Sequence, residues 1–500
     1  MTTPIITTDT DDGTLEQVTA AARRAAPALA RTTAAERASW LHAVADALDA
    51  AVDELVSLAD EETSLGDARL RGEVARTSGQ LRLFGQVIDD GAYLEATIDH
   101  ADPNATPPRP DLRRMLLPLG PVAVFTASNF PFAFSVAGGD TASALAAGCP
   151  VIVKGHSGHP RLSVRTAEIV LDTLREAGAP EGTFAHVGGR EAGRLLVCDP
   201  AVKAAGFTGS LGGGRALFDL ASSRPDPIPF YGELSSINPV VITPGAASAR
   251  AQDLVRGLIG SFTLGAGQFC TKPGIVLVPH SGEIEAAIVE EFGDHDPQPM
   301  LNTRIADSFA QSLEELLLTD RVEVVAGDAG SAVSSGAARP VVLATTVSDL
   351  AAATDVLLEE CFGPSTLLVG YADDDELERA VEMLPGTLTV TVHAEDAETD
   401  GLTQLVARLR ELAGRVIFGG WPTGVAVSWA QQHGGPWPST TSSLHTSVGA
   451  TAIRRFLRPV AFQDTPESLL PDELREQTTF SIPRRVDGQL ELPSRGARRP

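Results

Sequence analysis

Aromatic residues and cysteines are scarce in this 500-residue sequence. Aromatic side chains make up only 5% of it, whereas glycine occurs 47 times, so close packing through small side chains is expected. The four cysteines lie far apart, at Cys149, Cys198, Cys270 and Cys361, and no CxxC pair occurs. This spacing argues against a disulfide framework and against a cysteine-based zinc site, so no metal is expected.

Long apolar segments are missing as well. No apolar run reaches the length of a membrane span. The N-terminal segment MTTPIITTDTDDGT is polar and acidic and lacks the apolar core of a signal peptide. Together with the cysteine usage, these features predict a protein of the reducing cytoplasm that has no membrane partner.

Basic residues are strongly outnumbered. The chain carries 39 Lys and Arg against 65 Asp and Glu, which gives a formal net charge of −26. Nucleic acids and anionic membranes are bound through clustered basic side chains, so neither is expected as a partner. An anionic ligand would have to be held by a few local cations or by backbone N–H groups at helix N-termini. The length predicts two or three globular domains.

Hydrophobic patterning along the chain predicts an α/β fold. Residues 14–94 are expected to form helices, one of them starting with a capping box between Thr33 and Glu36. Short apolar runs then alternate with helical patterns, including an Ala-rich helix over 133–147, up to residue 238. A second alternating region covers 239–430. Such alternation is typical of two doubly wound parallel sheets.

Three segments show neither helical periodicity nor the short apolar runs of strands. Residues 96–112 are rich in Pro, Asp and Asn and are expected to form an irregular excursion or a short edge strand. Residues 431–450 are rich in Gly, Pro, Ser and Thr and are expected to form an ordered loop. The end of the chain, 466–500, mixes Pro with charge and is compatible with a strand arm, a linker or disorder.

One stretch, GSFTLGAGQFCTKPG at 260–274, places Cys270 just after Gly265, Ala266 and Gly267. Glycines allow a tight turn and the close approach of a ligand. A cysteine in such a turn can attack an electrophilic carbon as its thiolate. The alternative is a buried structural thiol.

Two polar residues at expected strand ends can assist such a nucleophile. Glu233 ends an apolar strand, and a carboxylate there can act as a general base if burial raises its pKa. A salt-bridged or capping glutamate is the alternative. Asn129, before Phe130-Pro131, can donate its amide to an oxyanion or can simply occupy a turn.

Other strand ends carry groups suited to a nucleotide. Lys154 ends a strand and leads through His156 and Ser157 into a helix, although it can equally be a surface lysine. The turn GFTGSLGGG at 206–214 opens a helix whose N–H groups can hold a phosphate. The segment 359–364 offers a carboxylate that can bind a sugar and an aromatic side chain that can pack on a flat ring. Each of these is a weak signal alone.

Taken together, these residues resemble the aldehyde dehydrogenase superfamily over roughly residues 20–465. The shared motifs occur in the family's order, namely Asn129-Phe-Pro, Lys154, Gly209-Ser210…Gly214, Glu233-Leu234, Gly267-Gln-Phe-Cys270 and Glu360-Cys-Phe362-Gly-Pro. The resemblance implies a cofactor-binding domain at 1–95 and 113–238 and a catalytic domain at 239–430. It also implies oligomerisation or bridging elements at 96–112 and 431–465, and a homodimer or homotetramer.

The resemblance also implies a role for each motif residue. Cys270 attacks the aldehyde, Asn129 and the Cys270 N–H hold the oxyanion, and Glu233 activates the water that releases the acid. The other motif residues hold NADP or NAD, namely Lys154, His156, Ser157, Gly209, Ser210, Gly214, Glu360 and Phe362. Six aromatic residues are further candidates for an aldehyde tunnel or for ordinary core, namely Phe132, Phe134, Phe262, Phe269, Trp421 and Trp437.

Finer motifs resemble an NADP-dependent branch that includes 2-oxoglutarate semialdehyde dehydrogenases and a bacterial fatty aldehyde dehydrogenase. Oxidation of 2-oxoglutarate semialdehyde is therefore expected, with a fatty aldehyde as the alternative. A CoA-acylating enzyme is disfavoured by Glu233, and a non-catalytic paralogue by the presence of both Cys270 and Glu233. Ser235-Ser236 replace the family's usual Gly-Gly, and the 280–340 region is short.

Overall fold

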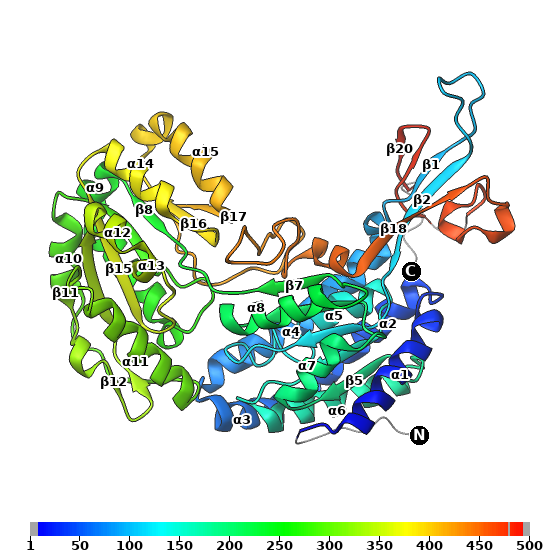
Figure 1. The fold of residues 1–500 in the computed structure, drawn as a ribbon, viewed down its shortest axis with the longest axis horizontal. Coiled ribbons are helices and arrows are strands. Elements are labelled where there is room, and N and C mark those ends of the chain that lie inside the picture. The colour runs from blue at the N-terminus through cyan, green and yellow to red at the C-terminus, as the bar shows by residue number, and fades with distance from the viewer. Residues whose placement is uncertain (1–8, 479–480, 494–500) are drawn as a thin grey trace.

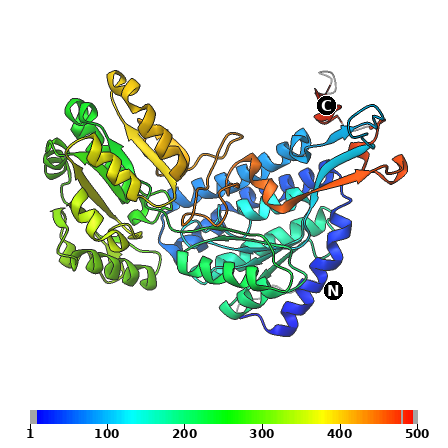
Figure 2. The ribbon, with the colours of Figure 1, turned by 45° about the horizontal axis from the view of Figure 1, so that its top comes forward.

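The computed structural model describes residues 9–478 and 481–493. Helices fill the N-terminal quarter, as predicted, and the capping box between Thr33 and Glu36 is present. The helices are α1 (Asp12–Leu29), α2 (Ala34–Ala50), α3 (Val52–Thr63) and α4 (Asp67–Asp90). Figure 1 shows two α/β bodies with an arm that projects from the larger one, and Figure 2 shows the same arm from a second direction.

The first α/β body contains a five-stranded parallel sheet in the order β5-β4-β3-β6-β7. Its strands are β3 (Val122–Phe125), β4 (Val151–Lys154), β5 (Phe184–Val187), β6 (Ala204–Thr208) and β7 (Phe230–Glu233). Its helices are α5 (Gly139–Ala147), α6 (Pro160–Glu176), α7 (Arg190–Cys198) and α8 (Leu211–Ser223). The chain winds outward in both directions from β3, so the sheet has a switch point at the carboxyl end of β3.

The helix expected at 133–147 begins later than the sequence suggested. Residues before Gly139 form turns, and the Gly139 N–H donates to the Ala133 carbonyl oxygen. The buried Glu73 accepts hydrogen bonds from the N–H groups of Phe132 and Ala133, 2.8 and 3.0 Å away. A side chain of α4 thus binds the N–H groups that a helix would otherwise begin with, and it holds this segment in place.

The second α/β body contains a seven-stranded sheet in the order β11-β14-β15-β9-β8-β16-β17. Its strands are β8 (Val240–Ile242), β9 (Ile275–Pro279), β11 (Glu323–Ala326), β14 (Val341–Thr346), β15 (Ser365–Tyr371), β16 (Thr387–His393) and β17 (Ala413–Phe418). All its pairings are parallel except β11 with β14. The doubly wound α/β class predicted for this region is therefore confirmed.

Helices cover both faces of this sheet. They are α9 (Pro244–Thr263), α10 (Glu283–Glu291), α11 (Thr303–Leu317), α12 (Val347–Ala352), α13 (Thr354–Leu357), α14 (Asp374–Met383) and α15 (Thr403–Leu412). Two separate apolar cores result, one on each side of the sheet. The 280–340 region adds a small antiparallel sheet of β10 (Gln298–Pro299), β12 (Val333–Ser334) and β13 (Ala337–Ala338).

The projecting arm is a sheet in the order β18-β2-β1-β19-β20. Its strands are β1 (Thr97–Asp99), β2 (Leu112–Pro118), β18 (Leu457–Gln463), β19 (Arg484–Val486) and β20 (Gln489–Glu491). Residues 113–118 therefore belong to the arm and not to the first α/β body, where the sequence had placed them. The C-terminal segment is a strand arm within 481–493, which was one of the three alternatives.

The segment 431–450 is an ordered loop that returns to the first α/β body. The Leu234 N–H donates to the Ser439 carbonyl oxygen at 2.8 Å, and Glu233 forms an isolated bridge with Thr440. The loop therefore extends the edge of β7 and crosses the gap between the two bodies. Among the described residues, no helix is both long and apolar enough to cross a membrane.

Candidate active site

Cys270 follows a tight turn between α9 and β9. Gly265, Ala266 and Gly267 all have positive φ angles of 57°, 54° and 67°. A Cβ on Gly267 would collide with the backbone of Gly363, so only glycine fits at that position. The turn thereby packs the cysteine segment against the 360–364 segment, which the sequence had singled out separately.

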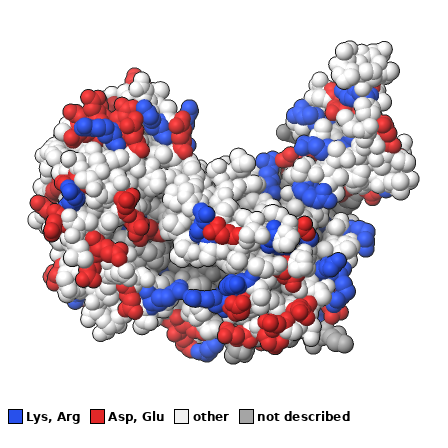
Figure 3. Space-filling view, in the orientation of Figure 1, with Lys and Arg blue, Asp and Glu red and all other residues white. Residues whose placement is uncertain are grey.

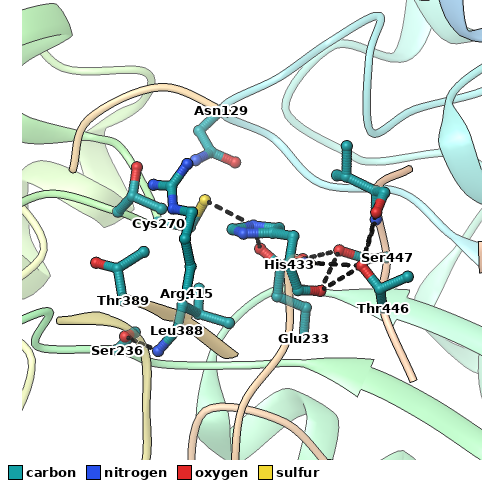
Figure 4. A network of polar contacts seen from close by, with 12 residues as sticks. Asn129, Glu233, Ser236, Cys270, Leu388, Thr389, Arg415, His433, Thr446 and Ser447 are labelled. Atoms are coloured by element: carbon teal, nitrogen blue, oxygen red, sulfur yellow. Dashed lines mark hydrogen bonds and ion pairs between the residues drawn. The ribbon is translucent and has the colours of Figure 1, made fainter. Parts of the chain in front are cut away.

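Three side chains meet at the sulfur (Figure 4). The Cys270 Sγ lies 3.6 Å from Nε2 of His433, and the same nitrogen lies 2.9 Å from Oε1 of Glu233. The second carboxylate oxygen of Glu233 accepts a hydrogen bond of 2.6 Å from Ser447 Oγ. Glu233 and His433 are buried. A nucleophile, an imidazole and a carboxylate are thus connected through a single ring nitrogen.

The pKa values of Cys270 and Glu233 are shifted in opposite directions. Burial, together with the Glu233 carboxylate, raises the pKa of the Cys270 thiol well above its usual 9.0, against a smaller opposing effect of Arg76. Burial alone would raise the pKa of Glu233, but His433, Ser447 and Cys270 outweigh it and lower that pKa. The condition stated from the sequence, that burial raises the Glu233 pKa, is not met, because the residue is hydrogen-bonded as well as buried. Glu233 is ionised at neutral pH and able to accept a proton.

Inactivation of the free enzyme by iodoacetamide should accelerate about tenfold per pH unit between pH 7 and pH 9, because only the thiolate reacts. The sign follows from the raised pKa, since the thiol stays protonated below it and its ionised fraction grows with pH. Loss of activity is the readout, so that alkylation of the exposed Cys198 does not count. A rate that is flat across this range would show that Cys270 is already ionised.

Asn129 lies beside the cysteine, as predicted. Its Nδ2 donates one hydrogen bond of 3.0 Å to the Gln268 carbonyl oxygen, two residues before Cys270. Its backbone carbonyl accepts a bond of 2.6 Å from Arg69. An amide nitrogen has two hydrogens, so one remains available for an oxyanion near Cys270.

A cavity of about 990 Å³ opens from Cys270 along the carboxyl ends of β3, β4 and β6. The predicted cofactor residues that line it are Lys154, His156, Ser157, Gly209, Ser210, Glu360 and Phe362. Ser210 N-caps α8 by accepting a bond from the Gly213 N–H, so the first turn of α8 faces the cavity. A helix N-terminus beside a switch point suits the pyrophosphate of a dinucleotide.

Three predicted cofactor residues differ in detail from expectation. Gly214 is not part of the cavity wall, and a Cβ there would collide with Leu234, so this glycine serves packing. Burial, with help from His159 and Lys154, lowers the pKa of His156 to about 3, so it is a neutral ring and not a cation. Burial raises the pKa of Glu360 to about 7, and its carboxyl contacts Ser235 and Ser236, the pair that departs from the family's Gly-Gly.

His433, Ser447, Arg76 and Arg415 were not assigned roles from the sequence. His433 lies within the segment 431–450, and a histidine in a Gly- and Pro-rich loop gives no signal of its own. Of the described residues, the ligand atoms of Glu233, Cys270 and His433 form the one set spaced for a metal, within 4.8 Å of one another. A metal there would occupy both the nucleophile and the base, so the cluster is better explained as catalytic.

The fold is α/β, and the site brings a cysteine, a histidine and a carboxylate together beside a cavity whose lining suits a dinucleotide. The sequence profile of the aldehyde dehydrogenase family matches residues 5–459, and the chain belongs to this family. It is accordingly an aldehyde oxidoreductase that uses NAD or NADP.

Two curated relatives cover almost the whole chain. The chain is 45% identical over 483 residues to alpha-ketoglutaric semialdehyde dehydrogenase 2 of Azospirillum brasilense, and 42% identical over 485 residues to alpha-ketoglutaric semialdehyde dehydrogenase of Acinetobacter baylyi. Each alignment covers 95% of this chain and 92% of the relative. The similarity to these two enzymes therefore extends over nearly the whole chain.

Solved structures share the fold at lower identity. Betaine aldehyde dehydrogenase from Staphylococcus aureus aligns with a TM-score of 0.77 and 21% identity, over 92% of this chain and 89% of that one. 1-Pyrroline-5-carboxylate dehydrogenase from Thermus with bound NAD aligns with a TM-score of 0.75 and 19% identity, over 91% and 86%. Both confirm the architecture predicted from the motif order.

Proposed function

We propose that this enzyme oxidises 2-oxoglutarate semialdehyde to 2-oxoglutarate. The observation that carries the proposal is the similarity, above 40% identity and over 95% of the chain, to two enzymes named for that aldehyde. The assembled Cys270, Glu233 and Asn129 supply the nucleophile, base and oxyanion donor that the reaction needs.

The chain's own residues divide the reaction into two halves. Cys270 loses its thiol proton to bulk water, and the thiolate then attacks the aldehyde carbon. The resulting oxyanion is stabilised by Asn129 Nδ2 and the Cys270 N–H. NAD(P) held by Lys154, Ser210 and Glu360 along the cavity would supply the hydride acceptor for that carbon, so that Cys270 is left as a thioester. Glu233 then removes a proton from water, which attacks the thioester and releases the acid. His433 and Ser447 hold the Glu233 carboxylate in place through both of its oxygens.

Steady-state rates with two aldehydes test this function. We expect kcat/KM for 2-oxoglutarate semialdehyde to exceed that for a long-chain alkanal such as dodecanal. The reverse order would favour the alternative, a fatty aldehyde dehydrogenase. Activity with neither aldehyde would remove both.

We also propose that NADP is the preferred cofactor. Ser157 lines the cavity as a short neutral side chain that can donate a hydrogen bond to a phosphate. Four cations line the same cavity, namely Lys154, Arg190, Arg194 and Arg304, against the three acidic residues Asp9, Glu233 and Glu360. Burial and the nearby Arg190 lower the pKa of Lys154, as expected where positive charge is in excess. Figure 3 shows basic side chains along one edge of a hollow in this face. The positive electrostatic potential of these basic side chains favours the 2′-phosphate of NADP.

Ser157→Glu should lower kcat/KM for NADP about tenfold or more relative to NAD, because a like-charge pair at about 4 Å costs on the order of 1–4 kcal/mol. The ratio of kcat/KM for the two cofactors is the measurement. Ser222→Glu, at an exposed position on α8 outside the cavity, is the matched control. A wild-type enzyme that favours NAD tenfold, or an unchanged ratio in Ser157→Glu, would show that residue 157 does not set the preference.

The enzyme is further proposed to be a homodimer or homotetramer. The arm extends away from the first α/β body, and a projecting sheet of this kind gains cover when a second copy packs on it (Figures 1 and 2). Multi-angle light scattering at micromolar concentration should give a multiple of 52.2 kDa. A mass equal to that of one chain would contradict the prediction.

A further inference from the structure

A group of aromatic rings lies near Cys270 and is not part of the cofactor cavity wall. The buried rings of Phe130, Phe134 and Phe269 pack together with Val425 and Val427. Phe130 meets Phe134 and Phe269 edge to face, with centroids 5.4 and 5.2 Å apart. The Phe134 ring centroid lies 6.3 Å from that of His433. Two of the six aromatic candidates from the sequence, Phe134 and Phe269, therefore lie near the nucleophile.

Two arginines of α4 cover these rings. The guanidinium carbon of Arg69 lies 4.7 Å from the Phe269 centroid, and that of Arg76 lies 5.3 Å from the Phe134 centroid. Arg69 is bound to the Asn129 carbonyl oxygen. Among the described residues, Nη1 of Arg69 and both Nε and Nη2 of Arg76 are buried and have no hydrogen-bond partner.

A third arginine approaches from β17. Arg415 donates from Nη1 to the Gly424 carbonyl oxygen at 2.9 Å and from Nη2 to the Pro422 carbonyl oxygen at 2.6 Å. Figure 4 shows its guanidinium beside Cys270 and Asn129. Its Nε is buried and has no partner in the described part of the chain. The loop that fixes Arg415 continues into Val425, which packs on the aromatic group.

Neither of these two arginines is held in an ion pair by the described part of the protein. Among the described residues, neither Arg76 nor Arg415 lies within ion-pair distance of a carboxylate, whereas many arginines of this chain do. Glu73, one turn before Arg76 on α4, interacts with it electrostatically but forms no ion pair with it. One oxygen of Glu73 accepts from the N–H groups of Phe132 and Ala133, and the other has no hydrogen-bond partner among the described residues. Glu233 is bound by His433 and Ser447. Buried, unsatisfied guanidinium N–H groups are costly unless a ligand binds them.

We propose that Arg76 and Arg415 together bind the carboxylate of the substrate and so orient its aldehyde end at Cys270. The proposal rests on the proposed function and specifies how the acid is recognised. A guanidinium with free N–H groups binds a carboxylate through charge-assisted hydrogen bonds. The ligand class is a short aldehyde with a carboxylate at the far end of its chain. The aromatic group packs against its methylene groups. Arg69 is assigned to positioning Asn129, because its Nη2 binds the backbone carbonyl of that residue and its guanidinium lies over the Phe269 ring.

Kinetics with a charged and an uncharged aldehyde of equal chain length test the proposal. For Arg76→Gln and Arg415→Gln, we expect kcat/KM with 2-oxoglutarate semialdehyde to fall about 10- to 100-fold, mainly through KM, because each variant loses charge-assisted hydrogen bonds. With pentanal, which lacks the carboxylate, kcat/KM should stay within threefold of the wild type. Arg82→Gln is the matched control, because Arg82 lies on the same helix and pairs with Asp46 and Asp49 at the surface.

Equal losses with both aldehydes, or no loss with either, would overturn the assignment of the two arginines. A wild type that already prefers pentanal would instead contradict the proposed function, so the two failures are distinguishable. Calorimetric binding of 2-oxoglutarate gives a second readout, which should weaken in both Gln variants. Arg76→Lys and Arg415→Lys keep a charge and should recover part of that binding, which a loss of folding would not allow.

Discussion

Cys270→Ala should lower turnover by more than about a thousandfold, since without the thiolate no covalent intermediate can form. The sulfur is the one nucleophile at the point where Asn129, Glu233 and His433 converge among the described residues. The variant should fold normally, because the substitution removes a single atom from a turn fixed by its glycines. The measurement is the steady-state rate of reduced cofactor formation.

The other three cysteines provide the controls for this experiment. Cys149 donates to the Phe456 carbonyl oxygen in the core, Cys361 is buried near Lys272, and Cys198 is exposed at the end of α7. None lies at the site, so each Ala variant should retain most of the activity. Substantial turnover by Cys270→Ala would mean that the assigned nucleophile is wrong.

Glu233→Gln should separate the two halves of the reaction. Water takes no part in the acylation half of the reaction, so that half does not need Glu233 as a general base. A burst of reduced cofactor close to one equivalent per site is therefore expected. Hydrolysis of the thioester should then slow by about 100- to 10,000-fold, which is the usual contribution of a general base. Stopped-flow absorbance followed by mass spectrometry of the acylated enzyme measures both steps.

The outcome of that experiment also distinguishes the enzyme classes considered from the sequence. Release of the acyl group at the normal rate in Glu233→Gln would place the base elsewhere, and His433 would be the next candidate because its Nε2 contacts both Sγ and the carboxylate. Faster release on addition of coenzyme A than in water would indicate a CoA-acylating enzyme.

The residues that could be predicted from the sequence are those at the ends of strands. Asn129, Lys154 and Glu233 each follow a short apolar run, and the carboxyl ends of parallel strands meet at one edge of a sheet. The cysteine turn was recognisable because consecutive positive φ angles require glycine or a strained residue. Local patterns of this kind determine both the element and the position of the side chain within it.

The residues that were missed reach the site through long-range contacts. His433 and Ser447 lie in a loop without periodicity, and they meet Glu233 across 200 and 214 residues of sequence. Arg76 lies on an ordinary helix, where its sequence neighbours do not reveal that its guanidinium is buried without an acceptor. The lowered pKa of Glu233 could not be predicted for the same reason, because it depends on those distant partners.

The arm sheet has a consequence for the order in which a newly synthesised chain can fold. Both α/β sheets contain all their strands once residue 418 has been made, whereas β1 pairs with β19 through Thr97 and Arg485. The His100 N–H likewise donates to Asp487, 387 residues further along the chain. A chain that ends prematurely after 447 would thus carry every catalytic side chain, yet its β1 edge would stay open and available for mispairing with other chains. Pairing of β19 with β1 covers this edge, so a chain truncated before β19 leaves the edge exposed.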